Sequence, residues 1–101
     1  MRRVFIASPY RGDIKANTKK AQRLCRLAVA DGCAPFAPHL LYPQFLKDEG
    51  FERDAGIDCG LAYMRVCDEL WLPHDVEPTE GMRAEIEYAK LLRLTIIRVP
   101  E

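Results

Sequence analysis

The sequence lacks a long apolar run and a net charge. No apolar stretch in its 101 residues approaches the roughly 20 that a membrane-spanning helix needs. The apolar run after Met1 is broken at Ser8 and Pro9 before it could form a secretion signal. Fifteen basic and fifteen acidic residues cancel to a formal charge of zero, which disfavours nucleic acid and membrane surfaces as partners. We therefore expect a cytoplasmic protein that binds a small molecule.

Two cofactor signatures are also missing. The four cysteines, Cys25, Cys33, Cys59 and Cys67, show no Cys-x-x-Cys spacing, and each lies in apolar sequence. We expect reduced, largely buried thiols, with a disulfide or a zinc site as the less favoured alternative. The Gly-x-Gly-x-x-Gly fingerprint is absent, which disfavours a nicotinamide-dependent oxidoreductase. We predict neither a metal nor another cofactor.

Strand-like and helix-like patterns alternate along the whole chain. Four short apolar runs predict strands, at residues 4–7, 33–37, 66–72 and 94–99. Pro35 suggests that the second strand lies at an edge or ends early, and Asp68 and Glu69 should lie near solvent at the start of the third. Helical spacing predicts three helices: one from Asp13 to a stop at Gly32, one over residues 58–65, and one from an N-cap at Thr79 to about Leu92. Residues 38–57 lose this period and predict a long functional loop.

This alternation is typical of βαβ units and a parallel sheet. We expect a single α/β domain over residues 1–101, with a Rossmann-like three-layer fold and a four-stranded parallel sheet. The segments after the strands, 8–13, 38–42 and 73–85, should then meet at one edge of the sheet, where α/β folds bind ligands. Both histidines lie in these segments. Loops are polar in any case, so this gathering alone has a structural explanation as well.

Two of these segments contain groups suited to chemistry. Ser8, Arg11 and Gly12 precede the first helix, where a hydroxyl, a guanidinium and backbone N–H groups could hold a phosphate. Alternatively, Asp13 caps the helix and Arg11 is solvated. Glu85 lies early in the last predicted helix, whose dipole should keep the carboxylate ionised as a nucleophile. The alternative is a surface carboxylate that pairs with a neighbouring side chain.

The chain resembles the nucleoside 2-deoxyribosyltransferase-like superfamily, which includes 2′-deoxynucleoside 5′-monophosphate N-glycosidases and many small bacterial and phage proteins. The resemblance lies in residues 5–12 (FIASPYRG) and 81–89 (GMRAEIEYA) and extends over nearly the whole chain. It implies hydrolysis or transfer at the N-glycosidic bond of a nucleoside or its 5′-monophosphate. Active sites in this superfamily often use residues of a neighbouring subunit, so a homodimer is also implied.

The resemblance also implies roles for individual residues. Glu85 would attack the anomeric carbon, and Tyr10 would orient it. Ser8, Arg11, Gly12 and Thr79 match phosphate-side positions, next to Gly81. The superfamily's pocket Asp, which handles the leaving base, is replaced here by Gly60, so the acid is left open among three candidates: Asp58, His39 and Glu80. The missing Asp favours an alternative function, a non-catalytic nucleotide-binding or sensing module.

Overall fold

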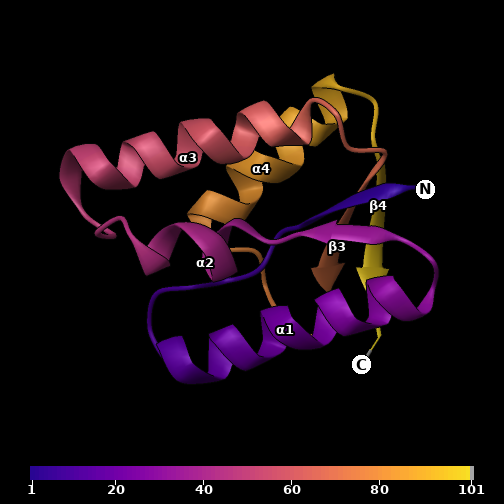
Figure 1. Cartoon of the computed structure of the whole chain (residues 1–101), viewed down its shortest axis with the longest axis horizontal. Helices are drawn as coiled ribbons and strands as arrows, with labels where there is room; N and C mark the ends of the chain where they lie inside the picture. Colours follow the sequence, from indigo (N-terminus) through magenta and orange to yellow (C-terminus); the bar gives the residue numbers. More distant parts are fainter. Residues whose placement is uncertain (101) are drawn as a thin grey trace.

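Helices cover both faces of a four-stranded sheet in the computed structural model, which describes residues 1–100 (Figure 1). The elements are β1 (Arg3–Ile6), α1 (Ile14–Ala30), β2 (Ala34–Phe36), α2 (Pro38–Leu41), the 3-10 turn η1 (Tyr42–Gln44), α3 (Gly50–Met64), β3 (Glu69–Pro73), α4 (Glu80–Leu91) and β4 (Thr95–Val99). All neighbouring strands pair in parallel, in the order β2-β1-β3-β4. The predicted Rossmann-like α/β fold, with its second strand at an edge, is confirmed.

The central strand β1 is buried on both sides because successive side chains point to opposite faces of a sheet. Val4 and Ile6 pack with Leu24 on the face covered by α1. Phe5 packs with Met64 on the face covered by α3 and α4. Figure 1 shows these helices on opposite sides of the sheet. The period-two alternation of one short apolar run therefore contributes to two separate cores.

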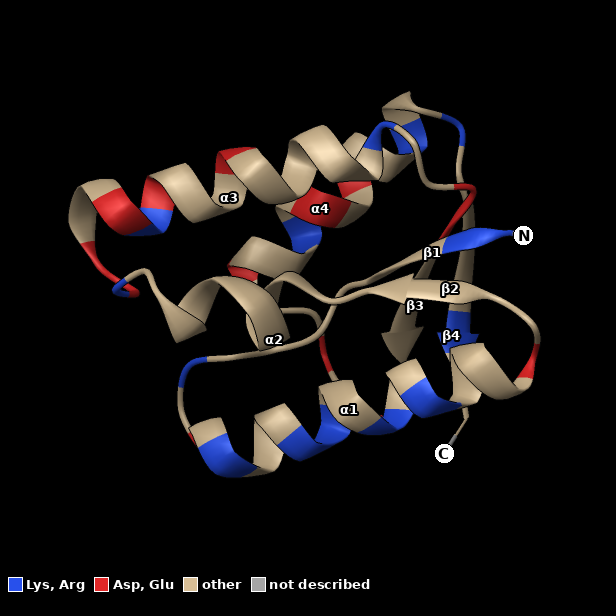
Figure 2. Cartoon of the chain, viewed as in Figure 1, with Lys and Arg blue, Asp and Glu red and all other residues tan. Residues whose placement is uncertain are grey.

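Helix α1 forms where its pattern predicts it. The Asp13 carboxylate caps its first turn by accepting a hydrogen bond from the Ala16 N–H at 3.1 Å. Basic residues recur along α1 (Figure 2), and all of them except Lys20 are exposed, while Ala21, Leu24 and Ala28 are buried. Gly32, with φ of 76°, allows the left-handed conformation that ends the helix. The capping role considered for Asp13 is therefore the one the structure contains.

The long loop predicted over residues 38–57 was wrong. The segment forms α2, η1 and the first half of α3, which begins at Gly50 rather than at residue 58. Its sequence hides the helix because glycines lower helix propensity and because Phe51 and Ile57 are exposed, which blurs the amphipathic pattern. Close packing stabilises it instead, since the backbone at Gly56 lies against Leu46 and Tyr42.

At the start of β3, Asp68 is exposed as expected, but the expectation for Glu69 fails. Glu69 is buried rather than near solvent. Its carboxylate accepts hydrogen bonds from Trp71 Nε1 at 2.8 Å and from Arg2 Nη1 at 3.1 Å. A buried carboxylate is tolerated when donors satisfy it in this way. These two donors explain why an acidic residue can be buried at the start of β3.

Candidate functional site

A cavity of about 310 Å³ opens beside the ends of β1 and β3. The chain leaves β1 towards β2 and later crosses back to β3, so the connections after β1 and β3 diverge and leave a crevice between them. Its lining comes from the segment after β1, from α2 and η1, from α3 with the loop before it, and from the start of α4. These segments therefore meet at one edge of the sheet, as the sequence predicted.

Seven of the ten predicted site residues line this cavity: Tyr10, Arg11, His39, Thr79, Glu80, Gly81 and Glu85. The other three do not. Ser8 is buried, and its hydroxyl has no hydrogen-bond partner among residues 1–100. Gly12 lies in an exposed turn with φ of 99°. Of the four expected phosphate-side residues, Arg11 and Thr79 therefore line the cavity, whereas Ser8 and Gly12 do not.

Asp58 also lies outside the cavity, exposed on α3. Residues two apart on a helix are separated by about 200° around its axis. Because Gly60 lines the cavity, Asp58 points to the opposite side of the helix. Asp58 is therefore not in the position that the predicted catalytic role requires.

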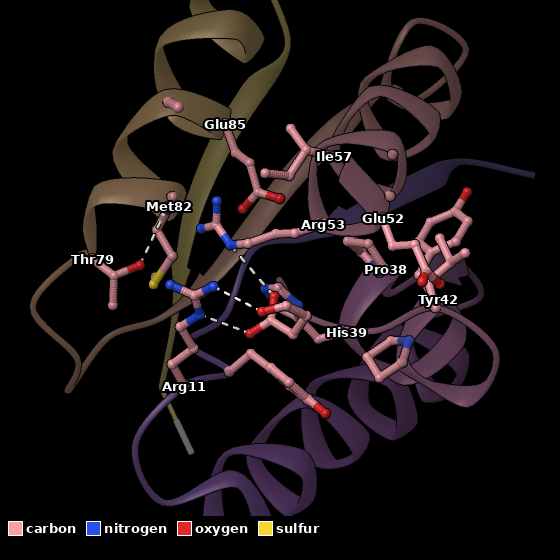
Figure 3. A pocket seen from close by; sticks show the side chains of 18 of the residues that line it. Arg11, Pro38, His39, Tyr42, Glu52, Arg53, Ile57, Thr79, Met82 and Glu85 are labelled. Carbon is pink, nitrogen blue, oxygen red and sulfur yellow. Dashed lines mark hydrogen bonds and ion pairs between the residues drawn. The ribbon is translucent and has the colours of Figure 1, made fainter. Parts of the chain in front are cut away.

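Glu85 extends from α4 into the cavity (Figure 3). Thr79 fixes the start of this helix, since its Oγ1 accepts a hydrogen bond from the Met82 N–H at 3.2 Å. Glu85 Oε1 is buried and has no hydrogen-bond partner in the described chain. Burial raises the pKa of this carboxyl to about 8. The expectation of an ionised Glu85 was wrong. The helix dipole acts mainly within the first turn, and Glu85 lies beyond that turn, so the cost of desolvating the charged carboxylate determines its pKa.

Tyr10 contacts His39 rather than Glu85. The two rings stack with centroids 5.2 Å apart and an interplanar angle of 19°. No hydrogen bond joins Tyr10 to Glu85 in the described residues, so the expected orienting contact is not formed. Burial lowers the pKa of the His39 imidazole. The pair forms a flat aromatic wall of the cavity.

Three further residues shape the site and were not foreseen. Asn17 Nδ2 donates to the main-chain oxygens of Tyr10 at 3.0 Å and Arg11 at 3.1 Å, which holds the loop after β1. Asp48 accepts from Arg11 Nε at 2.7 Å and lies 3.4 Å from Arg53 Nε (Figure 3). Asp48 and Arg53 fall in the segment that was interpreted as a loop, where no local pattern marked them.

The cysteines follow their prediction in part. All four are free thiols, and Cys33 and Cys67 are buried, one on each side of the sheet. Cys59 is exposed. Within residues 1–100, no cluster of His, Cys, Asp or Glu could hold a metal ion, and no helix is long and apolar enough to cross a bilayer.

Several solved structures share this fold. A 2-deoxyribosyltransferase from Bacillus psychrosaccharolyticus matches 97% of this chain with a TM-score of 0.72 at 17% sequence identity. One from Leishmania mexicana matches 99% with a TM-score of 0.67 at 19% identity. A CMP N-glycosidase from Clostridium botulinum matches 98% with a TM-score of 0.62 at 18% identity. The chain spans 72%, 65% and 69% of those three proteins, respectively.

These similarities show that the chain shares the fold of these proteins, which is the fold that the resemblance implied. A comparison with curated protein sequences finds no significant match. Residues 2–99 match the family described as a domain of unknown function, DUF7768, and the chain belongs to that family.

Proposed function

We propose that this protein hydrolyses or transfers at the N-glycosidic bond of a nucleoside or its 5′-monophosphate, with Glu85 as the nucleophile. The observation that carries the proposal is the buried Oε1 of Glu85, which has no partner and lies in a cavity at the ligand-binding edge of the sheet. A buried polar atom without a partner is costly, and such atoms concentrate at functional sites. The shared fold adds support, since the similar structures include two deoxyribosyltransferases and an N-glycosidase.

The proposed reaction has two steps. A Glu85 carboxylate oxygen bonds to the anomeric carbon as the N-glycosidic bond breaks, and the bonding electrons leave with the base, which takes up a proton. Water, or a second base, then attacks the same carbon and releases Glu85. With a pKa of about 8, roughly a tenth of Glu85 is ionised at pH 7. We therefore expect base release to accelerate as the pH rises towards 8.

The acid that protonates the leaving base should be a residue that lines the cavity. His39 and Glu80 are there, and Asp58 is not. The backbone at Gly60, where the resemblance would place an Asp, lies against Pro38, whose Cβ is 3.6 Å from the position a Gly60 side chain would take. We propose that Glu80, or His39 in its protonated form, takes this role, and that substituting the one responsible slows release of poor leaving bases most.

The test is base release from a panel of nucleosides and their 5′-monophosphates, followed by chromatography. Glu85→Gln should reduce the rate by at least about 10³-fold, because an amide cannot form the glycosyl intermediate. Glu87→Gln is the matched control, since Glu87 lies on the same helix, is exposed and pairs with Lys90 at 3.2 Å. Release at equal rates by Glu85→Gln and wild type would contradict the proposal, as would no release from any substrate.

A second candidate function is a nucleotide-binding or sensing module without turnover. It is favoured by the absence of Asp58 from the cavity and by the protonated state of Glu85 near neutral pH. Such a module would be stabilised by its ligand through mass action alone. A ligand-dependent rise in melting temperature without base release would support this function over catalysis.

A further inference from the structure

The cavity carries as many negative as positive side chains. Its basic lining residues are Arg11, Lys47 and Arg53, and its acidic ones, apart from the mostly protonated Glu85, are Asp48, Glu52 and Glu80. Sites that hold a phosphate usually offer it an excess of cationic donors. The charges of this lining cancel, so a phosphate dianion would gain little from the cavity as a whole.

Arg11 is the basic residue that follows β1, and two of its donor nitrogens, on one edge of the guanidinium, are already engaged. Its Nε donates to Asp48 Oδ2 at 2.7 Å, and its Nη2 donates to the Asp48 main-chain oxygen at 2.9 Å. Two parallel donors on one edge of a guanidinium are the geometry that holds a carboxylate or a phosphate. Here both donors of that edge bind Asp48, a residue of the protein itself, instead of a ligand.

The same carboxylate also faces a second arginine. Asp48 Oδ1 lies 3.4 Å from Arg53 Nε. The preceding residue is tied to α3 as well, because the Lys47 N–H donates to Glu52 Oε1 at 3.2 Å. Asp48 is thus held between the loop after β1 and helix α3, at the side of the cavity where Arg11 would meet a ligand.

The ion pair alone would not exclude a phosphate. The side chain of Arg11 is 60% exposed and that of Asp48 is 35% exposed, so solvent screens their attraction and limits it to about 1 kcal/mol or less. Exclusion comes instead from repulsion, because a phosphate that reaches Arg11 must lie next to a fixed carboxylate. A neutral nucleoside meets no such repulsion.

We infer that Asp48 is a specificity-determining residue that disfavours 5′-phosphorylated ligands, so that the ligand of this cavity is the uncharged nucleoside. The identity of the reaction rests on the function proposed above, whereas the selection between the two ligands is a statement about binding. The two can therefore be tested separately.

The experiment compares 2′-deoxynucleosides with their 5′-monophosphates at pH 7.5 and low salt, by calorimetric titration and by base release. We expect wild type to favour the nucleoside by roughly tenfold, the size of a screened charge repulsion. Asp48→Asn should remove most of that preference by strengthening monophosphate binding. Asp54→Asn, an exposed substitution on α3 that does not line the cavity, should leave the preference unchanged.

A double variant shows whether the gain acts through Arg11. Arg11→Gln in the Asp48→Asn background should abolish the gained monophosphate affinity, because the freed guanidinium is its source. Wild type that favours the monophosphate, an unchanged preference in Asp48→Asn, or binding of neither ligand would overturn the inference. Binding with the expected preference but without base release would count against the catalytic proposal alone.

Discussion

The two walls of the cavity differ in the sequence separation of the residues that form them. The α4 wall is built from neighbouring residues, with Thr79 as a cap and Glu85 a turn and a half further along. The opposite wall, made by α2, η1 and α3, depends on contacts between distant segments, such as Arg11 with Asp48 and Gly60 with Pro38. The difference teaches that the position of the proposed nucleophile follows from a short motif, whereas the residues proposed to select its ligand come together only in the assembled fold.

The largest expected effect concerns the α4 wall and the buried carboxyl of Glu85. Folding raises the pKa of this group from 4.5 to about 8, so the folded state holds a proton that the unfolded chain releases. The free energy of unfolding should therefore fall as the pH rises from about 4.5 to 8, by up to about 5 kcal/mol. Glu85→Gln should remove this loss.

Urea unfolding of both proteins at pH 4.5 and pH 9 measures the difference. The lowered pKa of His39 contributes in the opposite direction, but it is common to both proteins and cancels. We expect similar stabilities at pH 4.5 and a more stable Glu85→Gln at pH 9. Equal stabilities at pH 9 would mean that the carboxyl is well solvated and that this wall is not as closed as its geometry indicates.

The next effect compares one glycine from each wall. A side chain at Gly60 would meet Pro38, whereas at Gly81 it would meet nothing within 4 Å. Gly60→Leu should therefore destabilise the fold by about 1–3 kcal/mol through overpacking, while Gly81→Leu should change stability by less than about 0.5 kcal/mol. Thermal or urea unfolding of the two variants provides the measurement.

Ligand binding by Gly60→Leu and Gly81→Leu distinguishes the two walls further. Gly81→Leu should fold and yet lose nucleoside binding, because its side chain would enter the cavity that Gly81 lines. If Gly81→Leu binds ligand as wild type does, ligands do not approach the start of α4. Equal stability losses in the two variants would instead erase the distinction between the walls.

The smallest effect concerns the cap of α4. Thr79→Ala removes the hydrogen bond to the Met82 N–H and should cost about 1 kcal/mol of unfolding free energy. Thr79→Ser retains an oxygen at that position and should stay close to wild type. A loss of activity in both variants, with stability unchanged, would point to a role for the threonine in binding rather than in capping.

Much of the fold was readable because its signals are local. Short apolar runs flanked by turn residues predicted all four strands, and capping residues located α1 and α4. The start of α3 was missed because glycines and exposed aromatic residues mask its period. The buried position of Glu69 was missed because it depends on Arg2 and Trp71, one of which lies 67 residues away along the chain.

The sequence by itself determined the order of strands and helices, the edge of the sheet where polar segments meet, and the position of Glu85 near the start of α4. These features follow from side-chain periodicity and capping, which act over a few residues. Only the tertiary structure decided that Glu85 Oε1 is buried and that this burial raises the pKa of the carboxyl, that Asp58 points away, and that Asp48 engages Arg11. Desolvation, helix facing and long-range ion pairing arise only once distant segments have packed together.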